Sequence, residues 1–420
     1  MAQTLKFGNG TWATKKGSTL AFNDEDGNYK PLPFTTTRAT SATRVNKEGL
    51  IEVVESDRPR IDYTDSADGV LLLEKAATNL VTYSQNFTDS SWDLLDATIE
   101  NNSTLVTPQG VNGVQELREN SDNDDHLIKS DSTFTSSDCS FSVFAKYKGN
   151  DRNIKLSLGT GKYASFNLKD GYIFDVQTST IAKIEKYSNG WYRCSITGGV
   201  SSSKLNIILL NNVNEVYQGD GTSGIYIYGA QLEVGSLSSY IPSQGSAVTR
   251  VAETASGSGN SEVFNDSEGV LFADISPLAD DGTFRMIGIF DSQTSNVDRI
   301  QIYYRNDADK MSFLIEENNV NQFVKTLDVN TTQYNKCAFQ YGNTSSVYIN
   351  GFKLAEETGI TIPNNLQRLS FNEQNGGNDF YGKTKELAYY NTALTDAELE
   401  TLTSYSSLSE LVTELNLNTL

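Results

Sequence analysis

Amide and carboxylate side chains gather in the stretch FNEQNGGNDF, residues 371–380, near the C-terminal end of the sequence. Asparagine, glutamine and aspartate supply paired hydrogen-bond donors and acceptors, and glycines let a ligand approach the backbone. Such groups can hydrogen-bond the hydroxyls of a sugar or ligate a hard cation. The candidate carbohydrate-binding residues of this stretch are Asn372, Gln374, Asn375, Asn378 and Asp379. A simple turn is the competing interpretation.

Aromatic side chains are the second feature with this chemistry, because the C–H faces of a pyranose pack on flat rings. In IQIYYRND the alternation of a strand places Tyr304 on one face and Tyr303 on the other, so one tyrosine is expected to face outward. Trp191, beside Tyr192, has the same ambiguity. The remaining candidates are Trp92, Tyr163 and Tyr217. For each single residue, packing in a core is the competing interpretation.

The acidic stretch ENSDNDDH, residues 119–126, is a candidate for calcium binding, because hard oxygen ligands crowd there. The ligand candidates are Asp122, Asp124 and Asp125. The stretch lacks the spacing D-x-D-x-D-G-x5-E, and a solvated loop between strands is the alternative. No other cofactor is expected.

Residues for catalysis are scarce. The sequence holds one histidine, His126, and three cysteines without CxxC spacing, Cys139, Cys194 and Cys337, which disfavours zinc sites and histidine-based nucleophilic triads. Glycan hydrolysis on a sheet would need an E-x-D-x-x-E run, whose alternation aims the carboxylates into one cleft, and no such run is present. We therefore expect a protein that is not an enzyme, with its cysteines unpaired in strand cores.

The charge balance bears on partners. The formal net charge is −20 and the pI about 4.5, which repels phosphate backbones, so nucleic acid is not an expected partner. The sequence shows no signal-peptide pattern and no apolar run long enough to span a bilayer. We expect folding in a reducing cytoplasm and no membrane insertion.

The elements that must position these residues are short strands between Gly, Asn, Ser and Asp turns, the pattern of antiparallel sandwiches. The predicted fold class is all-β, with two tandem antiparallel β-sandwiches at residues 76–246 and 247–403. Residues 1–75 are predicted to be an irregular attachment and oligomerisation region, because their aromatics lack strands to bury them. Residues 404–420 are a predicted C-terminal tail, and the one predicted helix lies at 395–403.

The end of the sequence resembles laminin-G and concanavalin A-like lectin domains. The resemblance rests on the hairpin VYINGFKL at 347–354, the closing strand GKTKELAYYN at 382–391 and the short helix with ALTDAEL at 393–399, and it covers roughly 260–403. It implies that the ends of the domain lie together in the sandwich, that Leu387 and Tyr389 point opposite to Ala388 and Tyr390, and that loops bind glycans.

A second resemblance covers about 38–250. The stretches ATRVNKEGLIEVVESDRPRIDY (42–63), LLLEKAATNLVTYSQNF (71–87) and YIYGAQLEVGSLSSYIPSQGSAVTR (226–250) are similar to a module of tail fibres, spikes and head fibres of tailed bacteriophages. In those proteins a carbohydrate-binding-module-like jelly roll lies between such segments.

The bacteriophage resemblance implies a fibre or spike subunit on the virion surface, folded in the host cytoplasm. Its expected partners are itself, as a homotrimer, other virion proteins through the N-terminal region, and a host-surface glycan. A purely structural head decoration or collar protein is the alternative, and a polysaccharide depolymerase is the third reading.

Overall fold

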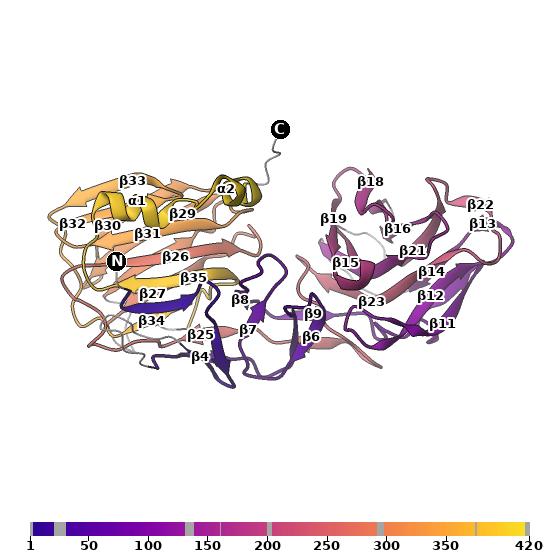
Figure 1. Cartoon of the computed structure of the whole chain (residues 1–420), viewed down its shortest axis with the longest axis horizontal. Helices are drawn as coiled ribbons and strands as arrows, with labels where there is room; N and C mark the ends of the chain where they lie inside the picture. The colour runs from indigo at the N-terminus through magenta and orange to yellow at the C-terminus, as the bar shows by residue number, and fades with distance from the viewer. Residues whose placement is uncertain are drawn as a thin grey trace. The chain divides into compact units, whose positions relative to one another are not determined.

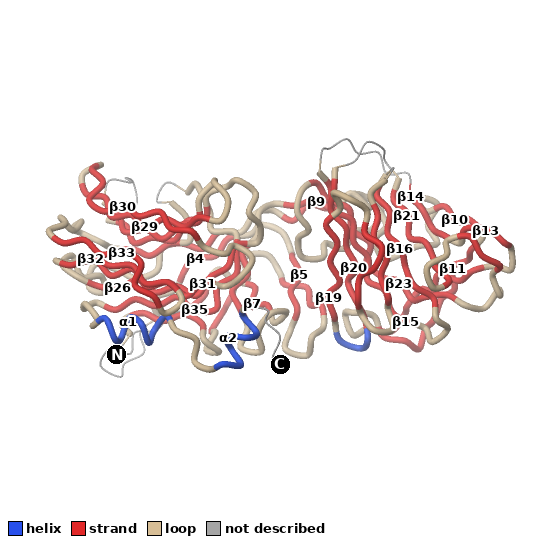
Figure 2. Tube along the Cα trace, turned by 90° about the horizontal axis from the view of Figure 1, so that it is seen from above, coloured by secondary structure: helices blue, strands red, loops and turns tan. Residues whose placement is uncertain are grey.

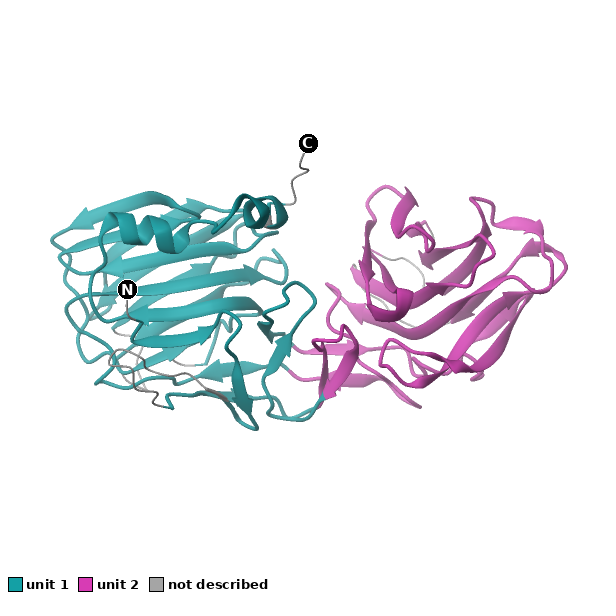
Figure 3. Cartoon of the chain, viewed as in Figure 1, with its two compact units in different colours: residues 1–40, 54–75, 252–420 teal, residues 41–53, 76–251 magenta. Residues whose placement is uncertain are grey.

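The structure, a computed structural model, describes residues 3–20, 31–130, 138–159, 161–199, 204–291, 298–373 and 376–415. Strands dominate the described chain, and neighbouring strands of the large sheets pair antiparallel (Figure 2). The predicted all-β class is therefore confirmed. The chain divides into two compact units, which Figure 3 colours separately: unit 1 comprises residues 1–40, 54–75 and 252–420, and unit 2 comprises residues 41–53 and 76–251.

Unit 2 is a sandwich of two six-stranded sheets. The first sheet runs in the order β10 (Asp93–Leu95), β14 (Leu127–Ser130), β21 (Leu205–Asn211), β16 (Arg152–Leu158), β17 (Tyr163–Asn167) and β18 (Tyr172–Val176). The second runs in the order β11 (Ala97–Val106), β12 (Asn112–Glu119), β23 (Gly224–Val234), β15 (Cys139–Tyr147), β20 (Trp191–Gly198) and β19 (Ile181–Lys186). Smaller pairs are β13 (Asn123–Asp125) with β22 (Val216–Gln218), β9 (Ala77–Asn79) with β24 (Val248–Arg250), and β5 (Ala42–Val45) with β6 (Ile51–Val54). A single 3-10 turn, η1, spans Ser188–Gly190.

The core of unit 2 lies between these two sheets. Alternate residues of each strand, such as Ile154 and Leu156 of β16, point into it and are fully buried. Cys139 and Cys194 lie in the same core, and burial raises the pKa of the Cys194 thiol.

The outer face of the second sheet is covered by the β5–β6 hairpin. Phe144 and Trp191 project from that face and pack with Ile51 of β6 and with Tyr240. The hydroxyl of Thr43 in β5 donates to the backbone oxygen of Tyr240 at 2.6 Å. A segment distant in sequence thus covers part of the outer side of this sandwich, around Phe144 and Trp191.

Unit 1 is also a sandwich (Figure 1). Its larger sheet runs β33 (Phe352–Thr358), β32 (Thr344–Ile349), β31 (Asn335–Tyr341), β26 (Gly269–Pro277), β35 (Gly382–Tyr390), β8 (Val70–Leu73) and β7 (Arg60–Asp62), with β1 (Leu5–Gly8) also paired to β35. The facing five-stranded sheet runs β30 (Val320–Asp328), β29 (Lys310–Glu317), β28 (Arg299–Tyr304), β27 (Arg285–Phe290) and β34 (Arg368–Ser370). A four-stranded sheet contains β2 (Ala13–Lys15), β3 (Ser18–Leu20), β4 (Phe34–Thr37) and β25 (Thr254–Ser256).

The C-terminal features predicted from the sequence are present. The first and last strands of the domain, β26 and β35, are neighbours, as the lectin resemblance implied. Leu387 and Tyr389 point into the main core, whereas Ala388 and Tyr390 pack under helix α1 (Asp396–Thr403). Thr395 caps α1 in a reciprocal capping box with Glu398. A second helix, α2 (Leu408–Glu414), lies in the predicted tail.

The N-terminal segment differs from its prediction as an irregular region that needs a partner to bury its aromatics. Phe7 of β1 and Phe34 of β4 are buried in the core of unit 1, with ring centroids 4.4 Å apart. Trp12 packs against the same core, and Phe22 lies outside the described residues. Strands of three or four residues carry too little periodicity to be recognised in the sequence, yet here they add edges to existing sheets.

Buried ion pairs hold this segment in unit 1. Arg60 Nη2 lies 2.7 Å from Glu74 Oε2, and Arg60 Nε donates to Glu253 Oε1 at 2.9 Å. Arg38 also pairs with Glu253, and all four side chains are almost completely inaccessible to solvent. Burial alone would lower the pKa of Arg60, but the carboxylates of Glu253 and Glu74 raise it above its ordinary value.

Candidate functional site

The two sheets of unit 1 differ in what lies on their outer sides. Val270 and Phe272 of the larger sheet pack under Leu399 of helix α1. The outer side of the five-stranded sheet instead carries polar, aromatic and apolar side chains. In each strand these outward residues alternate with residues that point into the core, such as Ile300 and Ile302 of β28. We call this side of the sheet the five-strand face; it consists of Met286, Arg299, Gln301, Tyr303, Ser312, Leu314 and Glu316. Of these seven residues, Arg299 and Tyr303 are partly exposed and the other five are buried.

Arg299 is the charged centre of the five-strand face. Its Nη2 pairs with Glu316 Oε2 at 3.1 Å, and its Nη1 lies 4.0 Å from Glu373 Oε1. Its Nε is buried and has no hydrogen-bond partner in the described part of the chain. A buried donor without a partner costs free energy, so it favours a ligand that brings an acceptor.

The loop 371–380 borders this face and is held at both ends. Phe371 and Phe380 are buried in the core, and the backbone N–H of Phe380 donates to the oxygen of Phe371 at 2.8 Å. Within the loop, the N–H of Glu373 donates to the oxygen of Gly377 at 2.8 Å. The N–H of Met286 in β27 donates to the oxygen of Asn378 at 3.1 Å, which fixes the loop beside the sheet.

The loop residues singled out in the sequence have different surroundings. Asn372 is buried and Asn378 is exposed with a positive φ of 50°. Asp379 is half-buried; its Oδ2 accepts from the Tyr381 hydroxyl at 3.0 Å, whereas its Oδ1 is buried without a hydrogen-bond partner in the described chain. Desolvation raises the pKa of Asp379 although hydrogen bonds to Tyr381 and Asn372 oppose it. Gln374 and Asn375 lie outside the described residues.

Tyr303 is the outward tyrosine of its pair. Its side chain is half-buried on the five-strand face, whereas Tyr304 is fully buried in the core. Tyr303 stands opposite Met286 in the sheet, and Met286 is bonded to Asn378 on its other side. With strands about 4.8 Å apart, the backbones of Tyr303 and Asn378 are about 10 Å apart. The structure therefore brings the tyrosine and the loop to the same end of one sheet.

Trp191 does not belong to this site, and its assignment as a sugar platform is corrected. It lies in unit 2, is fully buried, and donates from Nε1 to the backbone oxygen of Val106 at 2.9 Å. The β5–β6 hairpin covers its face of the sheet, so the ring has no surface free for a ligand. Strand alternation could not reveal this, because the cover comes from residues 41–53. Trp92 and Tyr217 are also buried, whereas Tyr163 is half-exposed.

The three calcium candidates do not converge on one point. Asp122 and Asp124 are exposed, and Asp122 Oδ2 accepts from the side chain of Asn120 at 2.5 Å. Asp124 and Asp125 are consecutive residues of β13 and point to opposite sides of it. No group of three or more His, Cys, Asp or Glu side chains among the described residues is placed to hold a metal ion. Calcium binding here stays an untested prediction.

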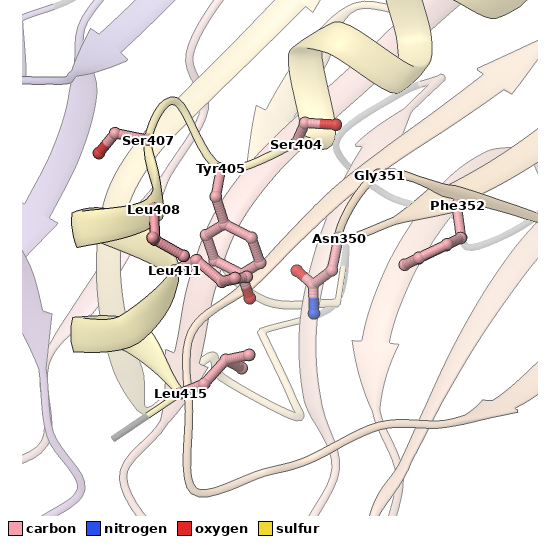
Figure 4. A pocket seen from close by; sticks show the side chains of 9 residues that line it. All are labelled: Asn350, Gly351, Phe352, Ser404, Tyr405, Ser407, Leu408, Leu411 and Leu415. Carbon is pink, nitrogen blue, oxygen red and sulfur yellow. The ribbon is translucent and has the colours of Figure 1, made fainter. Parts of the chain in front are cut away.

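A pocket of about 490 Å³ lies elsewhere in unit 1, beside the turn of the β32–β33 hairpin (Figure 4). Leucines of α2 and its end form one side, and Phe352 contributes from the hairpin. Its lining residues are Asn350, Gly351, Phe352, Ser404, Tyr405, Ser407, Leu408, Leu411 and Leu415. This lining is largely apolar and contains none of the predicted site residues. Neither described helix is long and apolar enough to cross a membrane.

Comparisons with solved structures found matches of low identity and low TM-score. The structure of a carbohydrate-binding module, family 40, of a Ruminococcus gnavus sialidase matches at 13% identity and a TM-score of 0.30, over 36% of this chain and 94% of that one. Domain 4 of an extracellular arabinanase from Geobacillus stearothermophilus, in complex with arabinotriose, matches at 16% identity and a TM-score of 0.28, over 40% of this chain and 82% of that one.

A Trypanosoma rangeli sialidase in complex with sialic acid matches at 10% identity and a TM-score of 0.29, over 92% of this chain and 65% of that one. At such identities and scores, likeness does not extend to function. No curated protein sequence matches the chain. Residues 273–400, however, match the family described as the concanavalin A-like lectin/glucanases superfamily. The C-terminal sandwich is therefore a concanavalin A-like domain.

Proposed function

We propose that the protein is a non-catalytic glycan-binding protein whose concanavalin A-like domain holds sugar on the five-strand face and loop 371–380. One observation carries the proposal: two buried polar atoms without partners, Arg299 Nε and Asp379 Oδ1, lie at a face that also presents the half-exposed ring of Tyr303. Arg299 and Tyr303 are four residues, about 13 Å, apart in β28, so the ligand would be an oligosaccharide that offers hydroxyls to both atoms and a C–H face to the ring.

Binding without hydrolysis fits the carboxylates of this face. Glycoside hydrolysis uses two carboxyl groups that flank the scissile bond, one of them as proton donor. Glu316 and Glu373 instead approach the same guanidinium, that of Arg299, at 3.1 and 4.0 Å. This arrangement positions the arginine as a hydrogen-bond donor rather than enclosing a bond to be cut.

The protein is proposed to act on the surface of a virus particle. The resemblance of residues 38–250 to fibre and spike modules supports a subunit on the surface of a bacteriophage particle, which attaches to host glycans. Assembly as a homotrimer would multiply weak single-site binding into avidity. Residues 1–75 would still join other virion proteins, although their described strands belong to the two units themselves. Immunogold labelling of purified particles tests this setting.

A glycan array with matched variants tests the binding function. Tyr303→Ala and Asp379→Asn should each weaken binding about tenfold, the effect of losing a ring contact or a hydrogen bond to a charged group. The controls are Phe352→Ala, which truncates an exposed aromatic of the larger sheet, and Asp328→Asn, whose carboxylate is 89% exposed. Both controls should bind like the unmodified protein.

Two other outcomes would contradict the proposal. Equal binding by all four variants would place the sugar elsewhere, and an array without any bound glycan would favour the purely structural decoration role. Release of reducing sugar from host polysaccharide would identify a depolymerase. Thermal unfolding of each variant shows whether a loss of binding reflects a loss of fold.

A further inference from the structure

The first sheet of unit 2 carries a second surface of unusual composition. One register row crosses its outer side from β14 to β18 and consists of Leu127, Ile208, Lys155, Ser165 and Phe174. The flanking residues in each strand, such as Leu156 and Phe166, point into the core, so this row faces away from it. We call the surface around this row the six-strand face.

The floor of the six-strand face is apolar. Leu127, Ile208 and Leu210 form a cluster of their own, separate from the core, with Phe174 packed against it. Tyr172 stands beside Phe174, with ring centroids 6.2 Å apart, and half of its surface is exposed. Apolar side chains and accessible rings therefore meet on the outer side of the sheet, where alternation would normally place polar residues.

A lysine is held in the middle of this apolar floor. Lys155 is only 8% exposed, and its Nζ lies 3.6 Å from the centroid of the Tyr163 ring. The same ammonium group forms an ion pair with Glu215. The aromatic face and the carboxylate fix Lys155 in one position, which prepares it as a donor without further loss of side-chain freedom.

Two polar atoms beside Lys155 have no hydrogen-bond partner among the described residues. Ser165 pairs directly with Lys155 in the sheet, is 1% exposed, and has an unpartnered Oγ. The buried Oδ1 of Asp125 is also unpartnered. Asp125 stands opposite Val216, next to Glu215, and desolvation followed by the charges of Glu215 and Asp124 raises the pKa of its carboxyl.

We propose that the six-strand face is a second carbohydrate site, selective for neutral sugar rings. The ring of Phe174 and the side of the Tyr163 ring that Lys155 does not occupy take the C–H face of the sugar, while Ser165 and Asp125 exchange hydrogen bonds with its hydroxyls. Two carboxylates, Asp125 and Glu215, lie around Lys155, and the neighbouring Lys129 is paired in the sheet with Asp93, so the site carries net negative charge and repels uronic or sialic acids.

This inference extends the proposed function, but its residues belong to the other unit, so the two sites can fail separately. The probes are a panel of neutral gluco-, galacto-, manno- and arabino-oligosaccharides, together with oligogalacturonate as the anionic comparison. Calorimetric titration of the full chain measures binding. We expect the unmodified protein to bind at least one neutral oligosaccharide and to bind oligogalacturonate at least tenfold more weakly.

The decisive variants are Ser165→Ala and Tyr163→Ala. Both should lower affinity for the neutral ligand, by about three- to tenfold and by about tenfold respectively. Ser165→Ala removes a hydroxyl that makes no bond in the free protein, so the fold should be unharmed. Its control is Ser346→Ala, which removes an equally buried and unpartnered hydroxyl in unit 1.

The two sites are separated by their own variants. A ligand whose binding is weakened by Ser165→Ala should bind the Tyr303→Ala variant as tightly as it binds the unmodified protein. A ligand whose binding is weakened only by Tyr303→Ala belongs to the five-strand face. The six-strand site is refuted if Ser165→Ala and Tyr163→Ala both bind as the unmodified protein does. It is equally refuted if no neutral oligosaccharide of the panel binds, or if oligogalacturonate binds as tightly through the same residues.

Discussion

The two sandwiches protect one outer sheet face each, but they do so with different elements. In unit 1 the helix α1 covers the larger sheet through Leu399, whereas in unit 2 the β5–β6 hairpin covers the second sheet through Ile51. The faces left to function also differ. The five-strand face relies on Arg299 and a bordering loop, while the six-strand face is built from strand residues around Lys155. The same sandwich architecture can thus present a candidate site beside a loop in one unit and a candidate site made of strand residues in the other.

The largest expected effect concerns the buried ion pairs, which only unit 1 uses to retain its N-terminal segment. Glu253→Ala should destabilise unit 1 by about 3–5 kcal/mol, because the buried Arg38 would lose its carboxylate partner and the buried Arg60 would keep only Glu74. Hydrogen exchange should rise in peptides of unit 1 and not in those of unit 2. The control is Glu52→Gln, which weakens the exposed pair with Arg44 and should change little. Equal loss of protection in both units would mean that they unfold as one body.

Removal of matched aliphatic residues tests whether the two covering elements are equivalent. Leu399→Ala in α1 and Ile51→Ala in β6 each delete a buried side chain, and each should cost about 2–5 kcal/mol in its own unit. The controls are Val320→Ala in unit 1 and Ile181→Ala in unit 2, which truncate exposed aliphatic side chains and should change stability little. If Ile51→Ala left unit 2 unchanged, the packing of the hairpin on the second sheet would contribute nothing to stability, and Val114, Tyr228 and Tyr240 would suffice to bury Trp191.

Features set by residues close together in the sequence could be predicted, whereas features set by distant residues could not. The closing strand, the Asn350–Gly351 hairpin and the α1 cap are local patterns, and the structure contains all three. Tyr303 and Trp191 have equivalent patterns in sequence, yet one faces outward and the other is buried, because residues 41–53 return to cover Trp191.

The six-strand face was invisible for a related reason. A single serine within a strand, such as Ser165, does not predict a binding site. Its role depends on Lys155, Asp125 and Phe174, which come from separate strands and meet only through the register of the folded sheet. The loop 371–380 was found because its composition is unusual within ten consecutive residues.

The smallest expected effect is a pH dependence that both candidate faces share. Desolvation raises the pKa of Asp379 and of Asp125 above the ordinary value of 3.8. The folded state therefore binds a proton more tightly than the unfolded state does at each carboxyl. Each carboxyl contributes its full share of stability below pH 3.8, and that share is lost as the pH rises through the raised pKa.

Asp379→Asn and Asp125→Asn should remove this dependence, each in its own unit. Relative to the unmodified protein, both variants should gain unfolding free energy between about pH 3 and about pH 7, because an amide avoids the cost of a buried charge. Unit-specific hydrogen exchange measured across that range is the readout, and Asp328→Asn, with its exposed carboxylate, is the control that should show no such gain. If a variant is instead less stable than the unmodified protein as the pH rises, the ionised carboxylate that it lacks is favourably held in the unmodified protein. That face would then have no unmet hydrogen bond to offer a sugar, and the comparison would leave the other face as the binding site.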